Sequence, residues 1–278
     1  MNKEQNTRPT PGDLERARQD QMIESNLARI DKKILVMSGK GGVGKSTVAA
    51  YLALLLSLKG FRVGLLDVDL HGPSIPRLLN IQGGFDAPEE GGVGPYKFSE
   101  NLGVVSMEMA MGDRDTAVIW RGPLKISAIR QFISDIDWGD LDYLIVDSPP
   151  GTGDEPLTVA QTIPDAGALI VTTPQEISLA DVRKSINFCR QVNMKILGVV
   201  ENMSGLVCPS CGEKVPVFGS GGGAKMSSQM QVPLLGEIPL DSRMVEMADK
   251  GRLDALVEES GLELNKAYEK VLNGILNS

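Results

Sequence analysis

The stretch 39–47 reads Gly-Lys-Gly-Gly-Val-Gly-Lys-Ser-Thr and constrains the fold more than any other part of the chain. Gly39, followed after four residues by Gly44-Lys45-Ser46, has the spacing of a phosphate-binding loop, which needs a strand before it and a helix after it. A short apolar run at 33–37 precedes the motif, and a helix-like stretch at 47–58 follows it. The motif therefore predicts a nucleoside triphosphate site between a strand and a helix.

Each part of this loop has a chemical role. Glycines let backbone N–H groups turn toward an anion, and the start of the helix adds N–H groups that have no partner within the helix. We expect Lys45 to reach the β- and γ-phosphates and the hydroxyl of Ser46 to hold Mg²⁺. The residues expected to bind the phosphates of ATP are Gly39, Gly41, Gly42, Val43, Gly44, Lys45, Ser46 and Thr47.

Composition places the chain among ordinary globular proteins. Its 278 residues are 42% hydrophobic and 23% charged, enough to bury a core. The formal net charge of −8 argues against a general nucleic-acid surface. No apolar run approaches the length of a membrane span, and the N-terminus lacks the apolar core of a secretory signal. Three cysteines do not make a secreted disulfide framework, so we expect a cytoplasmic protein that binds neither nucleic acid nor membrane.

Apolar runs alternate with helical stretches along most of the chain. Near-continuous Val, Ile and Leu runs are typical of strands covered on both faces, as in a parallel sheet. Their alternation with helices predicts an α/β fold with a doubly wound, mostly parallel sheet flanked by helices. In such folds ligands bind beyond the carboxyl ends of the strands. The expected strands are KILVM, RVGLLDVD, NLGVVSM, YLIVDS, AGALIVTT, KILGVVEN and LLGEIP.

The same pass along the chain suggests its organisation. Residues 1–30 are polar, and we expect an arm and a short helix there. Residues 31–278 are expected to form a single ATPase domain, with a loop near 205–225 that carries a Cys-x-x-Cys pair. Two glycine-rich stretches, 83–94 and 219–223, are expected to be surface loops.

Aspartates lie at the ends of two expected strands: Asp67 and Asp69 in one, and Asp147 in the other. An acidic side chain beside the phosphate loop can hold Mg²⁺ through its waters, and Asp147 is the better candidate. Asp69 could orient or deprotonate the attacking water, while Gly151 could donate its N–H in a loop that responds to the γ-phosphate. The alternative is that the aspartates only cap the following helices, and for Asp67 both interpretations stay open. His71, the only histidine, is expected to be a loop residue.

Cys208 and Cys211 form a second chemical feature, Cys-Pro-Ser-Cys-Gly, after the strand expected from KILGVVEN. Two thiolates at this spacing supply half the ligands of a tetrahedral zinc or a four-cysteine cluster. A two-fold dimer would supply the other half. A bridging iron–sulfur cluster, a bridging zinc, and a redox disulfide or inert turn all remain open from the residues alone. Cys189, in a helical stretch, is expected to be a packed apolar thiol.

Lys40, directly after the first glycine, is not required by the general phosphate-loop pattern. In this position it resembles the signature lysine of the deviant Walker A ATPases, which include septum-site, plasmid-partition, nitrogenase iron-protein and tail-anchor targeting ATPases. The resemblance implies a nucleotide-sandwich homodimer in which Lys40 touches the nucleotide of the partner chain. With Lys45 of the phosphate loop and Asp69 at the strand end, Lys40 completes the residues that we expect to act in catalysis.

The longer motifs together resemble the Mrp/ApbC family of P-loop ATPases, which carry and transfer iron–sulfur clusters. The motifs are DVDLHGPSIPRLL, WRGP, WGDLDYLIVD running into PPGTGD, ENMS, CPSC, FGSGG and IPLD. This resemblance implies a labile [4Fe–4S] cluster shared by Cys208 and Cys211 of two chains, slow ATP hydrolysis, and partners that are cluster donors and apo iron–sulfur proteins. It further implies that Asn202 hydrogen-bonds adenine and that Pro239 lines the base.

Two other functions are compatible with parts of the sequence. A MinD/ParA-like positioning or partition ATPase would bind membrane or DNA through its dimer, with a structural zinc at the cysteines. The acidic composition and the mixed charge of the stretch 253–276 count against it. An electron-transfer reductase like the nitrogenase iron protein would use two separated cysteines rather than one Cys-x-x-Cys loop. Residues 1–188 contain no cysteine, which does not fit the family branch with a second, N-terminal cysteine cluster.

Overall fold

The computed structural model describes residues 10–69, 72, 74–85, 92–110, 122–208, 211, 213–259 and 261–278. Within these residues the main sheet has eight strands in the order β10-β7-β6-β1-β5-β2-β4-β3. All neighbouring strands are parallel except β3, which is antiparallel to β4. The strands are β1 (Ile30–Ser38), β2 (Val63–Asp67), β3 (Tyr96–Ser99), β4 (Leu102–Ser106), β5 (Leu141–Asp147), β6 (Gly167–Thr172), β7 (Lys195–Glu201) and β10 (Leu234–Glu237).

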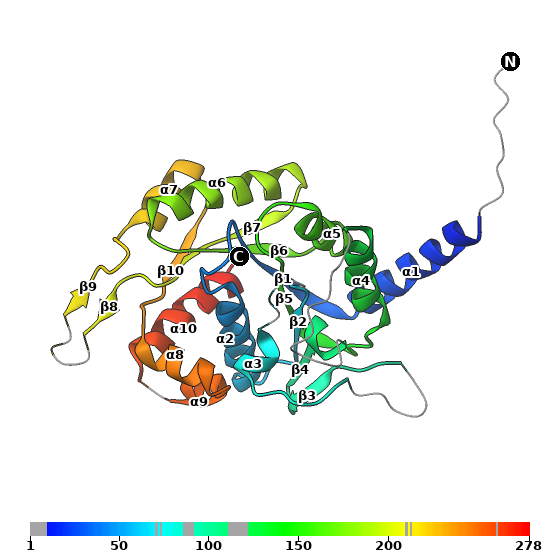
Figure 1. Cartoon of the computed structure of the whole chain (residues 1–278), viewed down its shortest axis with the longest axis horizontal. Helices are drawn as coiled ribbons and strands as arrows, with labels where there is room; N and C mark the ends of the chain where they lie inside the picture. Colours follow the sequence, from blue (N-terminus) through cyan, green and yellow to red (C-terminus); the bar gives the residue numbers. More distant parts are fainter. Residues whose placement is uncertain are drawn as a thin grey trace, which may run out of the picture.

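Helices cover both faces of this sheet (Figure 1). One layer consists of α2 (Lys45–Leu58), α3 (Ile75–Leu78), α8 (Ser242–Asp249), α9 (Leu253–Glu258) and α10 (Glu263–Leu276). The other layer consists of α1 (Pro11–Ala28), α4 (Gly122–Asp135), α5 (Asp154–Thr162), α6 (Glu176–Gln191) and α7 (Gly222–Met230). No helix in the described part of the chain is both long and apolar enough to cross a membrane.

The apolar side chains of the central strands pack into the hydrophobic cores on both faces of the sheet. In β1, Ile34 and Val36 pack into the core beneath α2 and α10, whereas Leu35 and Met37 pack into the core beneath α5 and α6. Successive side chains of a strand point to opposite faces, so a strand covered on both sides needs an unbroken apolar run. This burial on both faces confirms the predicted fold class.

Two strand predictions differ from the structure in detail. The strand β2 ends at Asp67, so Asp69 lies in the loop that follows it. The edge strand β3 was not expected, because its residues alternate between half-buried and exposed and carry no apolar run. His71 and the Trp120-Arg121 dipeptide, which were singled out in the sequence, lie outside the described residues.

The region near 205–225 is more ordered than the expected loop. It contains a two-stranded antiparallel hairpin formed by β8 (Leu206–Val207) and β9 (Lys214–Val215), which we call the cysteine hairpin (residues 206–215). The glycine-rich stretch 219–223 runs into α7, with Gly221 at the N-cap position. Its last two residues are buried in the first turn of that helix, so this stretch is not simply a surface loop.

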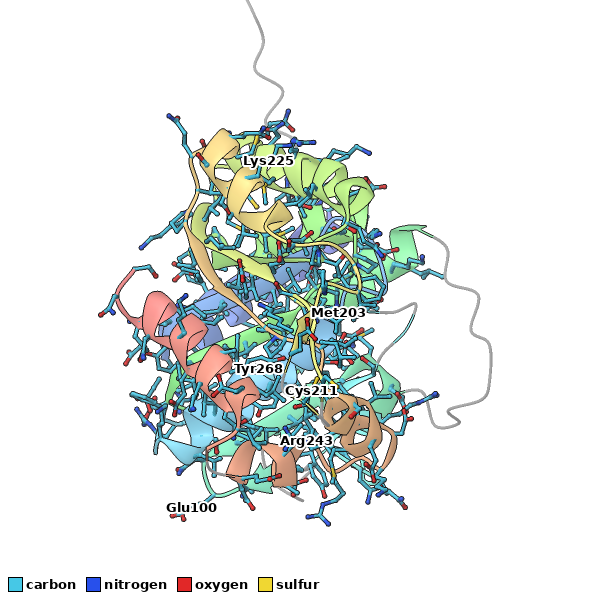
Figure 2. All side chains as sticks on the ribbon, turned by 90° about the vertical axis from the view of Figure 1, so that its left-hand side faces the viewer. Glu100, Met203, Cys211, Lys225, Arg243 and Tyr268 are labelled. Carbon is cyan, nitrogen blue, oxygen red and sulfur yellow. The ribbon has the colours of Figure 1, made fainter. Side chains whose placement is uncertain are left out.

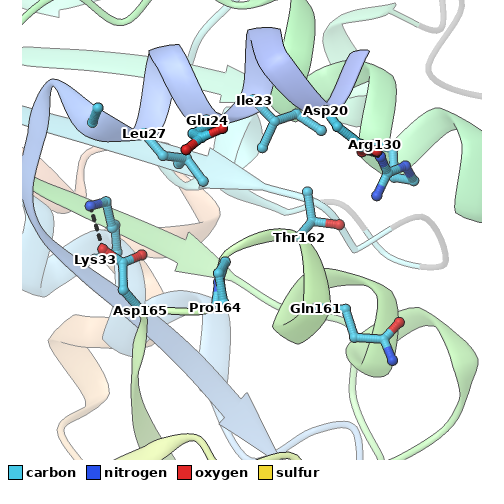
Figure 3. A pocket seen from close by; sticks show the side chains of 11 residues that line it. Asp20, Ile23, Glu24, Leu27, Lys33, Arg130, Gln161, Thr162, Pro164 and Asp165 are labelled. Atoms are coloured by element: carbon cyan, nitrogen blue, oxygen red, sulfur yellow. Dashed lines mark hydrogen bonds and ion pairs between the residues drawn. The ribbon is translucent and has the colours of Figure 1, made fainter. Parts of the chain in front are cut away.

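The helix α1 packs onto the body through Ile23 and Leu27, which are buried. A cavity of about 430 Å³ remains between α1, the start of β1 and the segment after α5 (Figure 3). On its wall the ammonium of Lys33 lies 2.7 Å from a carboxylate oxygen of Asp165. This cavity lies at the amino ends of β1 and β6, whereas ligands of such sheets bind at the carboxyl ends.

Candidate nucleotide site and cysteine hairpin

The phosphate loop connects the end of β1 at Ser38 to the start of α2 at Lys45. Gly44 is the N-cap residue of α2 and has left-handed backbone angles (φ 81°, ψ 24°). A Cβ atom at this position would lie 2.2 Å from Nδ2 of Asn202. Gly44 is therefore required both by its backbone conformation and by the close approach of Asn202.

The first glycine of the motif is required for a different reason. A Cβ atom at Gly39 would lie 2.5 Å from the carbonyl carbon and oxygen of Asp181 in α6. Its backbone φ is not in the left-handed region, so the constraint comes from packing. Gly39 lets α6 lie directly against the loop.

Lys45 is a buried cation between two carboxylates. Its Nζ atom lies 2.5 Å from Oδ1 of Asp147 and 3.6 Å from Oδ2 of Asp69. Burial acts to lower the pKa of the Lys45 ammonium, but the carboxylates of Asp147, Asp69 and Asp67 raise it above its ordinary value. Lys45 is therefore protonated and available to neutralise phosphate charge.

Asp147 closes β5 and is fully buried. Burial raises the pKa of its carboxyl group, while the charge of Lys45 opposes this shift. Its Oδ2 atom is buried and receives no hydrogen bond from any residue that the structure describes. A buried carboxylate oxygen without a donor, beside the half-buried Ser46, fits the oxygen ligands that a hydrated Mg²⁺ prefers.

Asp67 organises the loop that carries Asp69. Its two carboxylate oxygens accept hydrogen bonds from the backbone N–H groups of Asp69 (3.1 Å), Ser74 (3.2 Å) and Ile75 (3.4 Å), and from the hydroxyl of Ser106 (3.1 Å). Burial, followed by the charge of Asp147, raises the pKa of Asp67 to about 7. The structure favours the helix-capping interpretation for this residue, because it bonds to the first residues of α3.

Two adjoining cavities follow the phosphate loop. The first, of about 390 Å³, is lined by glycines of the loop and by Lys45, Asp69 and Pro150; we call it the phosphate cavity. The second, of about 210 Å³, is lined by Asn202, Pro239 and apolar side chains of α8; we call it the base cavity. Gly44 and Thr47 line both cavities. The two cavities thus form one path that suits a nucleotide, with its phosphates at the loop.

Asn202 and Pro239, which are 37 positions apart in the sequence, both line the base cavity. The side-chain Nδ2 of Asn202 donates a hydrogen bond to the carbonyl of Val43 in the phosphate loop (2.9 Å). Its backbone N–H donates to Thr172 at the end of β6 (2.7 Å). Asn202 therefore joins the phosphate loop to the base cavity, and its bond to adenine stays a prediction.

Gly151 and Lys40 occupy the edges of this site. The N–H of Gly151 donates to the carbonyl of Ser38 (2.8 Å), so in this structure it holds the loop after β5 against the end of β1. Lys40 is half-buried, and its carbonyl accepts a hydrogen bond from the hydroxyl of Ser38 (2.9 Å). The nucleotide contacts expected of both residues stay predictions.

The cysteine hairpin carries Cys208 and Cys211 at its tip. The backbone N–H of Cys208 donates to the carbonyl of Glu213 (2.9 Å), which continues the ladder beyond β8 and β9. Cys208 is half-buried and Cys211 is exposed, and no disulfide joins them. The hairpin projects from the body beside α7 and α8 (Figure 1), and Figure 2 shows Cys211 on that side of the molecule. Cys189 is buried, as predicted.

The sequence and the fold both match known proteins. Residues 29–276 match the family described as ParA: NUBPL iron-transfer P-loop NTPase. The chain belongs to this family. It is a nucleotide-binding P-loop NTPase of the iron–sulfur cluster carrier and assembly type, which confirms the resemblance to the Mrp/ApbC family.

Individual relatives of this NTPase cover most of its length. An iron–sulfur cluster carrier protein of Methanocaldococcus jannaschii is 46% identical over 261 residues, which span 93% of this chain and 90% of the relative. The cytosolic Fe-S cluster assembly factor CFD1 of Saccharomyces cerevisiae is 50% identical over 235 residues, 81% of this chain and 79% of the relative.

Two solved structures share the fold of this chain. A nucleotide-binding protein of Archaeoglobus fulgidus in complex with ADP is 40% identical with a TM-score of 0.76, over 85% of this chain and 93% of that one. The cell division ATPase MinD of Pyrococcus furiosus shares the fold, with a TM-score of 0.62 and 24% identity over 88% of this chain and 98% of that one.

Proposed function

We propose that this protein binds and hydrolyses ATP, and that two copies of it hold a [4Fe–4S] cluster between their cysteine hairpins and deliver it to apo iron–sulfur proteins. The observation that carries the proposal is the placement of Cys208 and Cys211 together at the tip of a projecting hairpin, on a chain with a complete phosphate loop. The relatives named as iron–sulfur cluster carriers support the choice of cargo.

The phosphate cavity supports the nucleotide part of this function. Lys45 is expected to leave Asp147 and neutralise the β- and γ-phosphates, because a buried ammonium prefers the larger negative charge. This movement frees Asp147, which with Ser46 would hold Mg²⁺; when bound, the ion neutralises phosphate charge. Asp69 lines the cavity and is placed to orient the attacking water.

A second copy of the chain completes both sites in this proposal. The two thiols of one hairpin are half of a four-cysteine ligand set, and a two-fold axis between hairpins would supply the other half. Lys40 lies at the edge of the phosphate loop, where it could reach a nucleotide in the facing copy. An exposed cluster held by only two thiols from each chain is suited to release, as a carrier requires. The composition supports a cytoplasmic setting, with a cluster donor and apo iron–sulfur proteins as the partners.

Anaerobic reconstitution with iron and sulfide tests the cargo directly. We expect about two irons per chain and the spectra of a [4Fe–4S] cluster. Cys208→Ala should lose the cluster, whereas Cys189→Ala, which changes a thiol buried in the hydrophobic core, should keep it. Roughly half a zinc per chain without a cluster would instead indicate a structural metal site and would contradict the carrier role.

Transfer to an apo iron–sulfur enzyme tests the coupling to ATP. The enzyme's recovered activity reports cluster delivery, and we expect delivery to change when Mg²⁺ and ATP are added. Strong stimulation of ATP hydrolysis by liposomes or DNA, without cluster delivery, would favour a positioning or partition ATPase instead.

A further inference from the structure

Glu201, the last residue of β7, is a buried carboxylate that bonds to both ends of the cysteine-bearing segment. One carboxylate oxygen accepts a hydrogen bond from the hydroxyl of Ser204 (2.7 Å), just before the hairpin. The other accepts from the backbone N–H of Gly223 (2.5 Å), in the first turn of α7 just after it. A single side chain therefore fixes where the segment leaves the body and where it returns.

The contact between Glu201 and α7 requires glycine at position 223. A Cβ atom at Gly223 would lie 2.7 Å from Oε2 of Glu201, so the helix can approach the carboxylate this closely only with glycine there. A carboxylate at the N-terminus of a helix also interacts favourably with the helix dipole. Glu201 and Gly223 thus form a fixed anchor between β7 and α7.

The base cavity shares the same anchor. The segment that contains Pro239 runs beside the start of the hairpin, and three backbone hydrogen bonds of 2.8 Å hold it there. Ile238 donates to the carbonyl of Glu201 and accepts from the N–H of Ser204, and Leu240 donates to Gly205. Leu240 also forms a parallel bridge with Leu206, the first residue of the hairpin. A displacement of Pro239 therefore displaces the hairpin stem.

From this arrangement we propose that Glu201 is a positioning residue that links occupation of the base cavity to the geometry of the cysteine hairpin. The route runs from the base through Pro239 and Asn202 to Glu201, and from its carboxylate to Ser204 and Gly223. The functional meaning of this link rests on the proposed role of Cys208 and Cys211 as cluster ligands. The link itself is a property of the iron-free chain.

This route begins at the base cavity and not at the phosphate cavity. Asp69 and Pro150 line the phosphate cavity, whereas Asn202 and Pro239 line the base cavity. The hydrogen bonds of the hairpin stem run to the segment that contains Pro239. The geometry therefore predicts that a ligand must fill the base cavity to affect the hairpin.

Hydrogen exchange of the iron-free protein tests this link. The probes are ADP, which fills both cavities, and pyrophosphate, which fills only the phosphate cavity. We expect ADP to slow exchange of the amides at 206–215 by about tenfold, the size of a typical coupling between sites. Pyrophosphate at saturation should slow exchange in the phosphate loop but leave the hairpin unchanged.

Three variants separate a positioning role from a general loss of structure. Glu201→Ala should strongly reduce the effect of ADP on the hairpin, while the backbone bonds between the stem and the segment that contains Pro239 remain. Glu201→Gln should keep most of it, because its amide oxygen can accept from Gly223 while its NH₂ donates to the Ser204 hydroxyl. Ser204→Ala, which removes one of the two bonds without disturbing the helix, should reduce the effect partially.

Three results of these measurements would overturn the proposed role of Glu201. An unchanged ADP effect in Glu201→Ala, or equal protection of the hairpin by pyrophosphate, would overturn the link. Absence of any ADP effect in the wild-type chain would also overturn it. Because no iron is present in these measurements, a protein that binds zinc instead of a cluster would refute the carrier function without changing the result for Glu201.

Discussion

The ammonium of Lys45 lies 2.5 Å from a carboxylate oxygen of Asp147, although 102 positions separate the two residues in the sequence. Lys45 lines the phosphate cavity and Asp147 is fully buried, so their two charges form a buried ion pair. In the proposed function, nucleotide binding exchanges this pair for contacts with phosphate. The pair also explains how a buried lysine and a fully buried aspartate coexist in the core.

Lys45→Ala is expected to destabilise the fold as well as abolish ATP hydrolysis. Removing one partner of a buried pair leaves an uncompensated charge, at a cost of about 3–5 kcal/mol. The double variant Lys45→Ala/Asp147→Asn should recover most of this stability while remaining inactive. Urea unfolding and ATPase assays of both proteins provide the measurement. A double variant as unstable as the single one would show that the ion pair is not the cause.

Gly44→Ala and Gly41→Ala form a matched pair within the phosphate loop. Alanine at 44 must adopt a left-handed backbone, at a cost of about 1–2 kcal/mol, and its Cβ would clash with Asn202. A Cβ at Gly41 meets no described atom within 4 Å. Thermal unfolding without nucleotide should therefore show a lower Tm for the first variant and no change for the second. Equal Tm values would contradict the packing of Asn202 against the loop.

Asn202→Ala is expected to weaken ADP binding by about five- to thirtyfold, the equivalent of one or two hydrogen bonds. Pyrophosphate affinity should change less, because Asn202 lines the base cavity and not the phosphate cavity. Titration calorimetry with both ligands makes the comparison. An equal loss for ADP and pyrophosphate would indicate that the bond from Asn202 to Val43 matters only for the shape of the loop.

Asp67 is expected to make the nucleotide-free protein less stable as the pH rises from about 4 to 7. Its pKa in the folded chain, about 7, lies above the ordinary value of 3.8, so folding favours the neutral carboxyl. Its favourable contribution is complete below pH 4 and is lost as the pH rises through the folded pKa, by at most about 4 kcal/mol. Urea unfolding at several pH values should show a weaker decline for Asp67→Asn. The same decline in that variant would refute the assignment to Asp67.

The three cysteines should differ sharply in reactivity toward a thiol reagent such as DTNB. Cys208 and Cys211 lie on the projecting hairpin, whereas Cys189 is buried and its pKa is raised to about 11 by that burial. We expect two thiols to react rapidly in the native protein and the third only after unfolding. In Cys189→Ala the slow thiol alone should disappear; loss of a fast thiol would contradict the structure.

Much of the fold could be predicted because its signals are local. The apolar runs at β1, β5 and β6 contribute side chains to the cores on both faces of the sheet. A strand buried on both faces is recognisable in the sequence because its apolar run is unbroken. The edge strand β3 carries no such signal, since it is only half covered. The hairpin of β8 and β9 was also missed, because two-residue strands are too short to show a period.

Some features of the candidate site could likewise be predicted from local spacing, and others could not. The spacing of Gly39, Gly44 and Lys45 specifies a phosphate loop, whereas the spacing of Cys208 and Cys211 specifies a pair of thiols on one turn and leaves open what they bind. No spacing within the chain could indicate the role of Glu201, although it stands beside Asn202 in a motif that the sequence analysis singled out. Its partners belong to the elements on either side of the hairpin.

The sequence by itself determined the doubly wound fold, the phosphate loop and the position of the paired thiols, because each depends on residues that are close neighbours in the chain. The tertiary structure alone decided that Lys45 pairs with Asp147, that Asn202 packs against Gly44, and that the carboxylate of Glu201 bonds to both Ser204 and Gly223. These contacts depend on the order of the strands in the sheet. That order brings distant carboxyl ends together, and it is fixed by the packing of the whole core.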